Sequence, residues 1–325
     1  MGAVVKIELL VNPCAKQLRA SWEEAVRPLV EACRERGVDV TVHPCDPARL
    51  TATARALALA GATAVVALGG DGTVSAVASG LLDTNVPLGV LPMGTMNNFS
   101  KDLGLRDMDD ALDALASDHR VRVDVGEVNG HVFVNNSSIG VYPRFVLDRD
   151  RQRRQTGARD WWLAIRRAAR RFFARYKLHV TIKIDDRVIH LRTPFVFVGN
   201  NPYSKDVRML GRRERLDLGV LDVFALRLRS RFEMFVRLLR AIVLREPPPD
   251  VEELVVDRAI VATKRSSIHV ALDGEVVRLD SPLEYRSRHG ALVVLAPRNI
   301  HEARRTPVGP SLRRPRPADR ARAPR

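Results

Sequence analysis

Ala64-Val65-Val66-Ala67-Leu68-Gly69-Gly70-Asp71-Gly72-Thr73 decides the fold, because an apolar run here ends in three glycines, an acid and a hydroxyl. The run predicts a buried strand, and the apolar spacing of residues 74–82 predicts the helix that follows. Glycines between a strand and a helix let the backbone turn sharply, and free N–H groups at a helix start attract anions. Residues 69–73 therefore predict a phosphate cradle, the alternative being a Gly-Asp-Gly surface turn.

The predicted cradle is neither of two common glycine loops, since Gly-x-x-x-x-Gly-Lys-Ser/Thr and Gly-x-Gly-x-x-Gly are both absent. Asp71 lies where its carboxylate would hold a divalent cation on bound phosphates, a task that suits a hard oxygen ligand. We therefore expect Mg²⁺ at Asp71.

A second apolar run, residues 86–92, leads into another glycine turn, Gly94-Thr95-Met96-Asn97. The two turns each follow a strand and are separated by one helix. They are therefore expected side by side at the carboxyl edge of a parallel sheet, where ligands bind in doubly wound folds.

Together the two turns resemble the diacylglycerol kinase catalytic domain, a family that includes sphingosine kinases and bacterial lipid kinases and is related more distantly to NAD kinases. The resemblance rests on Gly69–Thr73 and on Pro92-x-Gly94-Thr95-x-Asn97-x-Phe99, and it extends to Leu272-Asp273-Gly274-Glu275. It implies ATP as the phosphoryl donor, with ATP-binding positions at Asn12, Gly69, Gly70, Asp71, Gly72, Thr73, Gly94, Thr95 and Asn97.

The same resemblance implies that Asp273 accepts the proton of a lipid hydroxyl. An Asp-Gly pair is also one of the strongest hairpin signals, so a purely structural turn is the alternative at Asp273. Glu275 would share a face with Asp273 if the backbone were extended there, and it would then orient or assist the base. Asp124 opens the second domain and either reaches the cleft or is a capping or hinge residue.

Three departures separate this chain from the family pattern. Ser75-Ala76 stands where the family usually has Asn-Glu, and Asn98 stands where it usually has Asp. Leu218 directly precedes Gly219, where an Asp-Gly pair often helps to bind a structural magnesium ion. The sequence favours loss of that metal, with Asp217 as the substitute ligand if the site persists.

The chain divides at about residue 124. Strand and helix patterns alternate through residues 1–123, which predicts an α/β nucleotide-binding domain with a parallel sheet. Residues 124–290 carry hairpin signals at Asn129-Gly130 and Asp273-Gly274, with a weaker one at Asp185-Asp186, and predict a mainly antiparallel β domain that binds the lipid. The apolar run within 291–298 is expected to return to the first domain.

The composition is that of a globular protein with an excess of positive charge. Its 325 residues are 46% hydrophobic and carry a net charge of +15. Residues 303–325 hold eight arginines against one acid and are expected to form a disordered tail. Basic amphipathic patterns at 159–176 and 229–245 suit either an anionic lipid surface or packing on the β domain. The tail has no aromatic residue for stacking on bases, so no nucleic acid partner is expected.

The expected cellular location rests on the cysteine pattern and on the amino-terminal residues. The three cysteines lack zinc-type spacing, and the amino terminus lacks the basic and cleavage regions of a signal peptide. A cytoplasmic protein is expected, with peripheral contact at the inner membrane face. The oligomeric state is left open, a homodimer being one alternative.

These inferences predict an ATP-dependent lipid kinase that phosphorylates diacylglycerol or a related lipid. Two alternatives stay open: a small-molecule kinase related to NAD kinase, and a protein without turnover that binds lipid or nucleotide. The second is motivated by the acids missing at Ala76 and Asn98.

Overall fold

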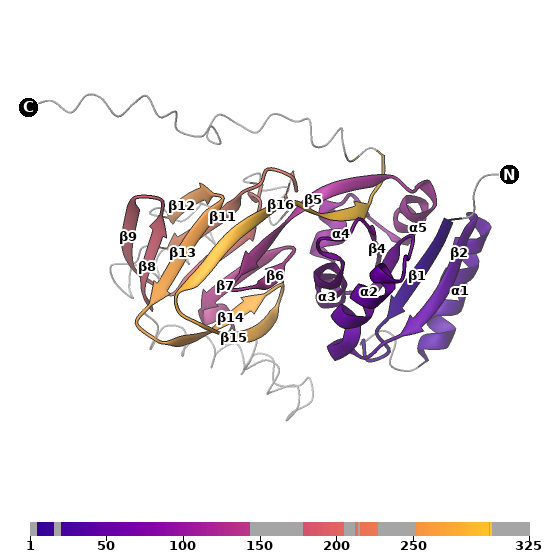
Figure 1. The fold of residues 1–325 in the computed structure, drawn as a ribbon, viewed down its shortest axis with the longest axis horizontal. Coiled ribbons are helices and arrows are strands. Elements are labelled where there is room, and N and C mark those ends of the chain that lie inside the picture. The colour runs from indigo at the N-terminus through magenta and orange to yellow at the C-terminus, as the bar shows by residue number, and fades with distance from the viewer. Residues whose placement is uncertain are drawn as a thin grey trace, which may run out of the picture.

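The structure, a computed structural model, describes residues 5–15, 21–143, 178–204, 212–213, 215–226, 251–298 and 300. It has two parts that lie end to end (Figure 1). The patterns at 159–176 and 229–245 and the tail 303–325 lie outside the described residues.

The first part is an α/β domain built on four parallel strands in the order β2-β1-β3-β4. Its elements follow the alternation predicted from the sequence, with one addition, the short helix α4. They are β1 Val5–Val11, α1 Trp22–Glu35, β2 Val38–Pro44, the 3₁₀ turn η1 Pro47–Arg49, α2 Leu50–Leu59, β3 Val65–Gly69, α3 Asp71–Leu81, β4 Leu88–Pro92, α4 Asn98–Asp102 and α5 Met108–Ser117.

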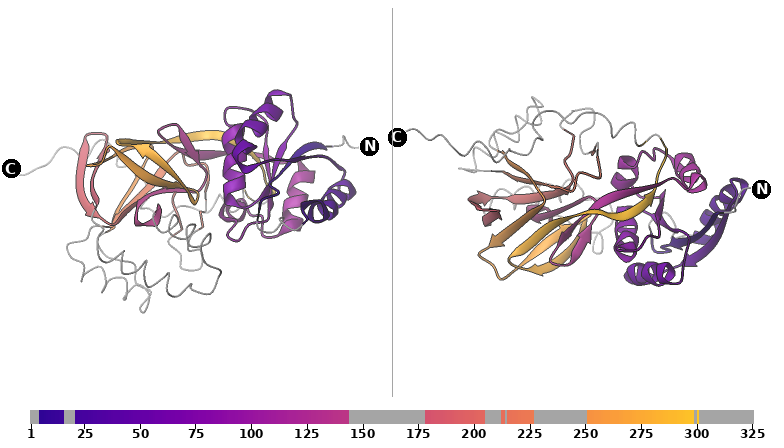
Figure 2. Two further views of the ribbon diagram at one scale, coloured as in Figure 1. Left: turned by 90° about the horizontal axis from the view of Figure 1, so that it is seen from below. Right: turned by 45° about the horizontal axis from the view of Figure 1, so that its top comes forward.

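Helices cover this sheet on both faces (Figure 2). Helix α2 packs against α3, and α1 packs against α5. Every residue of β3 is buried, which explains why its sequence is a continuous apolar run without alternation. The strand order reverses between β1 and β3, and ligands bind doubly wound sheets at the carboxyl ends of strands at such a reversal. Asn12 and Gly69 both lie there.

The second part is mainly antiparallel, as the hairpin signals predict. Its six-stranded sheet has the order β12-β11-β10-β7-β14-β15, and the outer strands β13, β8 and β9 extend the first sheet. The strands are β5 Arg120–Val128, β6 His131–Phe133, β7 Asn136–Gly140, β8 Leu178–Ile184, β9 Arg187–Thr193, β10 Phe195–Asn200, β11 Leu221–Leu226, β12 Val251–Val256, β13 Arg258–Thr263, β14 Ser267–Leu272, β15 Glu275–Asp280 and β16 Leu283–Leu295.

All three predicted hairpins are confirmed. Val128 pairs with His131, Leu272 with Glu275 and Ile184 with Arg187, each across a two-residue turn. The first turn residues, Asn129, Asp273 and Asp185, have φ values of 46°, 48° and 48°. A type I′ turn needs a positive φ at both central residues, and Gly130 and Gly274 complete it for the Asn129 and Asp273 turns with φ values of 80° and 93°. Asn and Asp tolerate this left-handed conformation better than most residues.

Two long strands join the parts. β5 pairs antiparallel with β16 along both halves, with a register shift between Arg288 and Leu292, and the end of β16 pairs parallel with β4 at Leu88. Figure 1 shows both strands crossing from one part to the other. The buried residues form two clusters, and β5 passes from the first at Val125 to the second at Val128.

None of the helices among the described residues is both long enough and apolar enough to cross a bilayer.

Candidate active site

The two glycine turns touch backbone to backbone, as their positions after β3 and β4 predict. A Cβ atom added at Gly94 would lie 2.5 Å from the Cα of Gly70. The Met93 amide also donates to the Gly69 carbonyl at 2.9 Å. Glycine is therefore required at this contact, because any side chain at residue 94 would force the two loops apart.

The amino terminus of α3 is open to an anion. Gly70 occupies the N-cap position, and no side chain among the described residues caps the helix. The first N–H groups of a helix lack intrahelical acceptors, so those of α3 can bind a phosphate. Asp71 opens the helix, and its Oδ1 accepts from the Phe99 amide of α4 at 3.2 Å. Thr73 is buried against Gly69, where an added Cβ would lie 2.5 Å from the threonine Oγ1.

Two of the predicted ATP-binding side chains shape their own turns. Asn97, at φ 50°, accepts from the Gly94 amide at 2.8 Å and donates to the Gly94 carbonyl at 2.9 Å. Asn12 accepts from the Cys14 amide at 2.9 Å just beyond β1. Thr95 is exposed beside Asn97. The structure therefore brings these residues to one sheet edge, with the two asparagines holding the backbone in place.

Asp273 sits at the tip of the β14–β15 hairpin, and its carboxylate accepts four hydrogen bonds. Oδ1 accepts from the amides of Asn135 at 2.8 Å and Asn136 at 3.0 Å. Oδ2 accepts from the amide of Val134 at 2.8 Å and from the Ser75 hydroxyl at 2.7 Å. Ser75 belongs to α3, so this last bond connects the hairpin to the helix that begins at the glycine loop.

Burial raises the pKa of Asp273, although the Ser75 hydroxyl and the three amides oppose the rise. Partial burial and the negative charge of Asp273 also raise the pKa of Glu275, although this residue stays exposed to solvent. Glu275 reaches the glycine loop, because a Cβ added at Gly72 would lie 2.9 Å from its Oε1. Both predicted catalytic carboxylates therefore meet the amino-terminal half of α3.

A buried ion pair supports this arrangement and is absent from the sequence predictions. The Arg213 Nε donates to the Asp102 carboxylate of α4 at 2.8 Å. Arg213 also donates to the Val134 carbonyl at 2.7 Å and to the Asn135 Oδ1 at 2.8 Å. It thereby holds the segment whose amides bind Asp273. The sequence contains no signal for this pair, since Arg213 is one of many arginines and Asp102 ends a five-residue helix.

Asp124 connects segments that lie far apart in the chain. It is fully buried and accepts from the Gly219 amide at 2.6 Å, the Asn201 Nδ2 at 3.1 Å and the Gly290 amide at 2.8 Å. His289 is a further partner, at 2.9 Å. Of the two interpretations left open for Asp124, these contacts fit a capping or hinge residue.

The described residues contain no cluster of three or more His, Cys, Asp or Glu side chains that could hold a metal by themselves. Mg²⁺ on a nucleotide needs only one or two carboxylates in addition to the phosphates, so Asp71 alone fits that requirement. Asp217 fits a metal less well, because it accepts from the Arg215 guanidinium at 3.1 Å.

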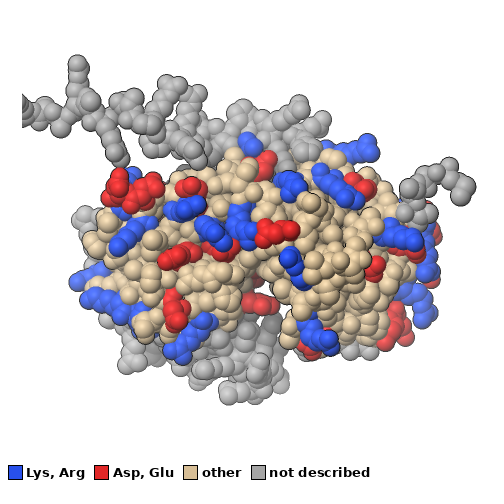
Figure 3. All heavy atoms as spheres, viewed as in Figure 1, with Lys and Arg blue, Asp and Glu red and all other residues tan. Residues whose placement is uncertain are grey.

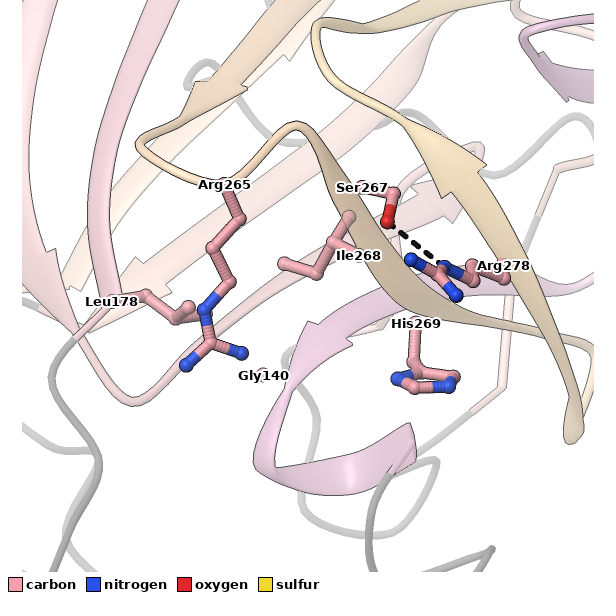
Figure 4. A pocket seen from close by; sticks show the side chains of 7 residues that line it. All are labelled: Gly140, Leu178, Arg265, Ser267, Ile268, His269 and Arg278. Carbon is pink, nitrogen blue, oxygen red and sulfur yellow. Dashed lines mark hydrogen bonds between the residues drawn. The ribbon is translucent and has the colours of Figure 1, made fainter.

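A separate pocket lies at the other end of the β14–β15 hairpin (Figure 4). It has a volume of about 260 Å³ and combines the apolar side chains of Leu178 and Ile268 with cationic Arg265 and Arg278. The Arg278 guanidinium donates to the Ser267 hydroxyl at 2.8 Å. Elsewhere, acidic and basic side chains are mixed over the face in Figure 3, without a large area of one sign.

Comparison with known proteins identifies the family that the glycine loops resemble. Residues 6–128 match the diacylglycerol kinase catalytic domain. The diacylglycerol kinase of Bacillus subtilis (strain 168) is 30% identical over 148 residues, which cover 44% of this chain and 48% of that protein. The diacylglycerol kinase of Staphylococcus haemolyticus is 40% identical over 79 residues, 23% of this chain and 24% of that protein. The matched segments thus span less than half of each relative.

The fold is similar over a longer stretch. A diacylglycerol kinase structure from Bacillus anthracis str. Sterne superimposes with a TM-score of 0.63 at 21% identity and covers 91% of this chain and 98% of that one. A second structure from that organism gives 0.70 at 23% identity and covers 91% and 96%. The expected resemblance and the two-part α/β fold are therefore confirmed.

Proposed function

Because residues 6–128 match the diacylglycerol kinase catalytic domain, we propose that this protein is an ATP-dependent lipid kinase. It transfers the γ-phosphoryl group of ATP to the hydroxyl of diacylglycerol or a related lipid. The proposal is carried by one contact between segments far apart in the chain: the β14–β15 hairpin lies against helix α3. Asp273 and Glu275 approach the same helix, α3, whose amino terminus forms the predicted phosphate cradle.

The ATP phosphates bind at the glycine loops. The amides at the start of α3 can donate to phosphate oxygens, and the contact between Gly70 and Gly94 holds the two loops together. Asp71 would hold Mg²⁺, which would neutralise phosphate charge when bound. Asn97 keeps the second glycine loop in shape, and Asn12 holds the turn that follows β1.

Asp273 acts as the general base. It takes the proton from the lipid hydroxyl while the hydroxyl oxygen bonds to the γ-phosphorus and the bond from that phosphorus to the ADP oxygen breaks. The products are ADP and a phosphorylated lipid, and the proton on Asp273 then passes to solvent. The raised pKa of Asp273 makes it a stronger base than an ordinary aspartate. Glu275, whose carboxylate approaches the loop at Gly72, orients the reacting groups.

A lipid is favoured over a soluble acceptor because the match to the diacylglycerol kinase domain covers both glycine loops. The net charge of +15 and the cationic pocket at Arg265 and Arg278 suit peripheral contact with an anionic membrane surface. We place the protein in the cytoplasm, at the inner membrane face. A homodimer stays an open alternative, and no nucleic acid partner is proposed.

The experiment incubates the purified full chain with γ-labelled ATP, Mg²⁺ and a membrane lipid extract. A labelled product that partitions into chloroform supports the lipid kinase. A labelled water-soluble product made from an added NAD pool would instead support the NAD kinase-like alternative. If neither product forms while labelled ATP still binds, the alternative without turnover is correct.

A further inference from the structure

The four donors to Asp273 are not equivalent. Three are backbone amides of residues 134–136, which belong to the same part of the molecule as Asp273 itself. Asn136 begins β7, and its carbonyl accepts from the Asp273 amide at 2.9 Å, while the Asn135 carbonyl accepts from Asn200 at 2.9 Å. These amides cannot leave the carboxylate without opening the sheet.

The fourth donor, Ser75, is a side chain from the other part of the molecule. It is half-buried on α3 and can leave Asp273 by rotation about a single bond. A carboxylate offers about four lone-pair directions, and all four are used here. A substrate hydroxyl that gives its proton to Asp273 must therefore replace one donor, and Ser75 is the only replaceable one among the described contacts of Asp273.

The chemistry of the replaced group matches that of the incoming one. A serine side chain ends in CH₂–OH, which is a primary alcohol, and the free hydroxyl of a 1,2-diacylglycerol is also a primary alcohol. Each presents an O–H donor on an unbranched carbon. The space that Ser75 fills against Oδ2 therefore suits the end of such a lipid.

We propose that Ser75 is a placeholder for the acceptor hydroxyl: it fills the substrate's position on Asp273 in the free protein and is displaced when a primary alcohol binds. The proposal rests on the proposed function, since it assigns the acceptor position of that same site. Ser75 thus lowers acceptor affinity and keeps water away from the base until the lipid arrives.

A second acceptor is available to the displaced hydroxyl. Serine in a helix can donate to the carbonyl four residues earlier. Ser79, one turn along α3, does so, donating to the Ser75 carbonyl at 2.9 Å. The equivalent acceptor for Ser75 is the Asp71 carbonyl, so rotation of Ser75 exchanges one hydrogen bond for another.

The test compares Ser75→Ala, Ser75→Thr and Ser79→Ala in the full chain. Calorimetry without ATP measures the Kd of dispersed dioctanoylglycerol, and kinetics with ATP give its KM. Ser75→Ala is expected to lower both about fivefold, because the substrate no longer competes with a hydrogen bond to a carboxylate. The KM of ATP should stay the same. Ser75→Thr keeps the hydroxyl and should retain the wild-type values, and so should Ser79→Ala.

An unchanged or raised Kd in Ser75→Ala, at the wild-type melting temperature, overturns the proposal. A fall in kcat with an unchanged lipid KM does so too, because it would make Ser75 a support for Asp273. Absence of dioctanoylglycerol binding to every variant also counts against it. If the wild type binds the alcohol but forms no phosphorylated product, the proposed kinase function fails, while the calorimetric comparison still decides the role of Ser75.

Discussion

Arg213 donates to Asp102 at 2.8 Å, and their side chains are 0% and 2% exposed, so a fully buried ion pair links the β domain to helix α4 of the α/β domain. The same guanidinium binds the Val134 and Asn200 carbonyls and the Asn135 side chain. The position of Asp273 thus depends on Arg213 through one intervening segment, residues 134–136.

Removing the guanidinium should destabilise the protein strongly. Arg213→Met leaves the Asp102 carboxylate buried without a cation, which costs about 3–5 kcal/mol in the free energy of unfolding. Urea denaturation measures the loss. Arg213→Met combined with Asp102→Leu should recover much of it, because no buried charge then stays unpaired. Arg106→Ala, which removes an exposed partner of Asp110, is the control and should change stability very little. An equally small effect at Arg213 would contradict the supporting role.

Asp273→Asn tests the general base. Asn keeps the left-handed turn but cannot accept a proton, so turnover should fall roughly 10²- to 10⁴-fold. Its NH₂ group cannot accept from the Val134 amide, so we also expect a loss of about 1–3 kcal/mol in stability. Asp185→Asn is the matched control, since Asp185 opens a similar hairpin with the same φ of 48°. Assays well below the melting temperature separate the two effects. If Asp273→Asn kept more than half of the wild-type turnover, Asp273 would be a structural turn residue and not the base.

The raised pKa of Asp273 should appear in the pH dependence. Because the base must be ionised, kcat/KM should rise with pH through a value above the ordinary aspartate pKa of 3.8. The stability contribution of this carboxyl should change with pH in the opposite direction. A carboxyl whose folded pKa is raised stabilises the fold most below its unfolded pKa, and this contribution is lost as pH rises through the folded pKa. Urea titrations at several pH values measure this contribution as the difference in the free energy of unfolding between the wild type and Asp273→Asn. If kcat/KM instead rose through a pKa at or below 3.8, the assignment of Asp273 as the base would be contradicted.

Two glycine substitutions should have different effects. Gly94→Ala places a Cβ 2.5 Å from the Gly70 Cα, so the two loops must separate, and both the melting temperature and ATP affinity should fall. Gly72→Ala meets only the far end of the Glu275 side chain at 2.9 Å, which can move aside. Its melting temperature should stay close to that of the wild type. Thermal unfolding with and without ATP distinguishes the two, and equal melting temperatures would rule out the backbone contact.

Deleting residues 303–325 should weaken association with anionic vesicles without changing turnover on detergent-dispersed lipid. The segment carries a net charge of +7, and each arginine near such a surface contributes about 1 kcal/mol. Vesicle sedimentation at moderate salt measures the difference. Equal binding of the truncated and full-length chains would exclude a membrane role for the tail.

The amino-acid sequence by itself determined the features that depend on neighbouring residues. The strand-turn-helix at residues 64–82 follows from an apolar run and glycines, and the hairpins at 129–130, 185–186 and 273–274 follow from residues that tolerate a positive φ. The parallel and antiparallel halves were predictable for the same reason. Helix α4 was not, because five residues carry too little periodicity to indicate a helix.

Only the tertiary structure decided which groups meet at the site. Asp273 acquires its four donors from α3 and residues 134–136, and Arg213 finds Asp102 across the two parts of the molecule. Asp124 was predicted equally well as a cleft residue or as a capping or hinge residue, and it is buried and bonded because Gly219 and Gly290 bring their amides to it. Such contacts join residues far apart in the chain, and their geometry is set by how the strands pair and the helices pack. No local pattern of residues encodes that packing, so the role of Ser75 becomes visible only once the chain is folded.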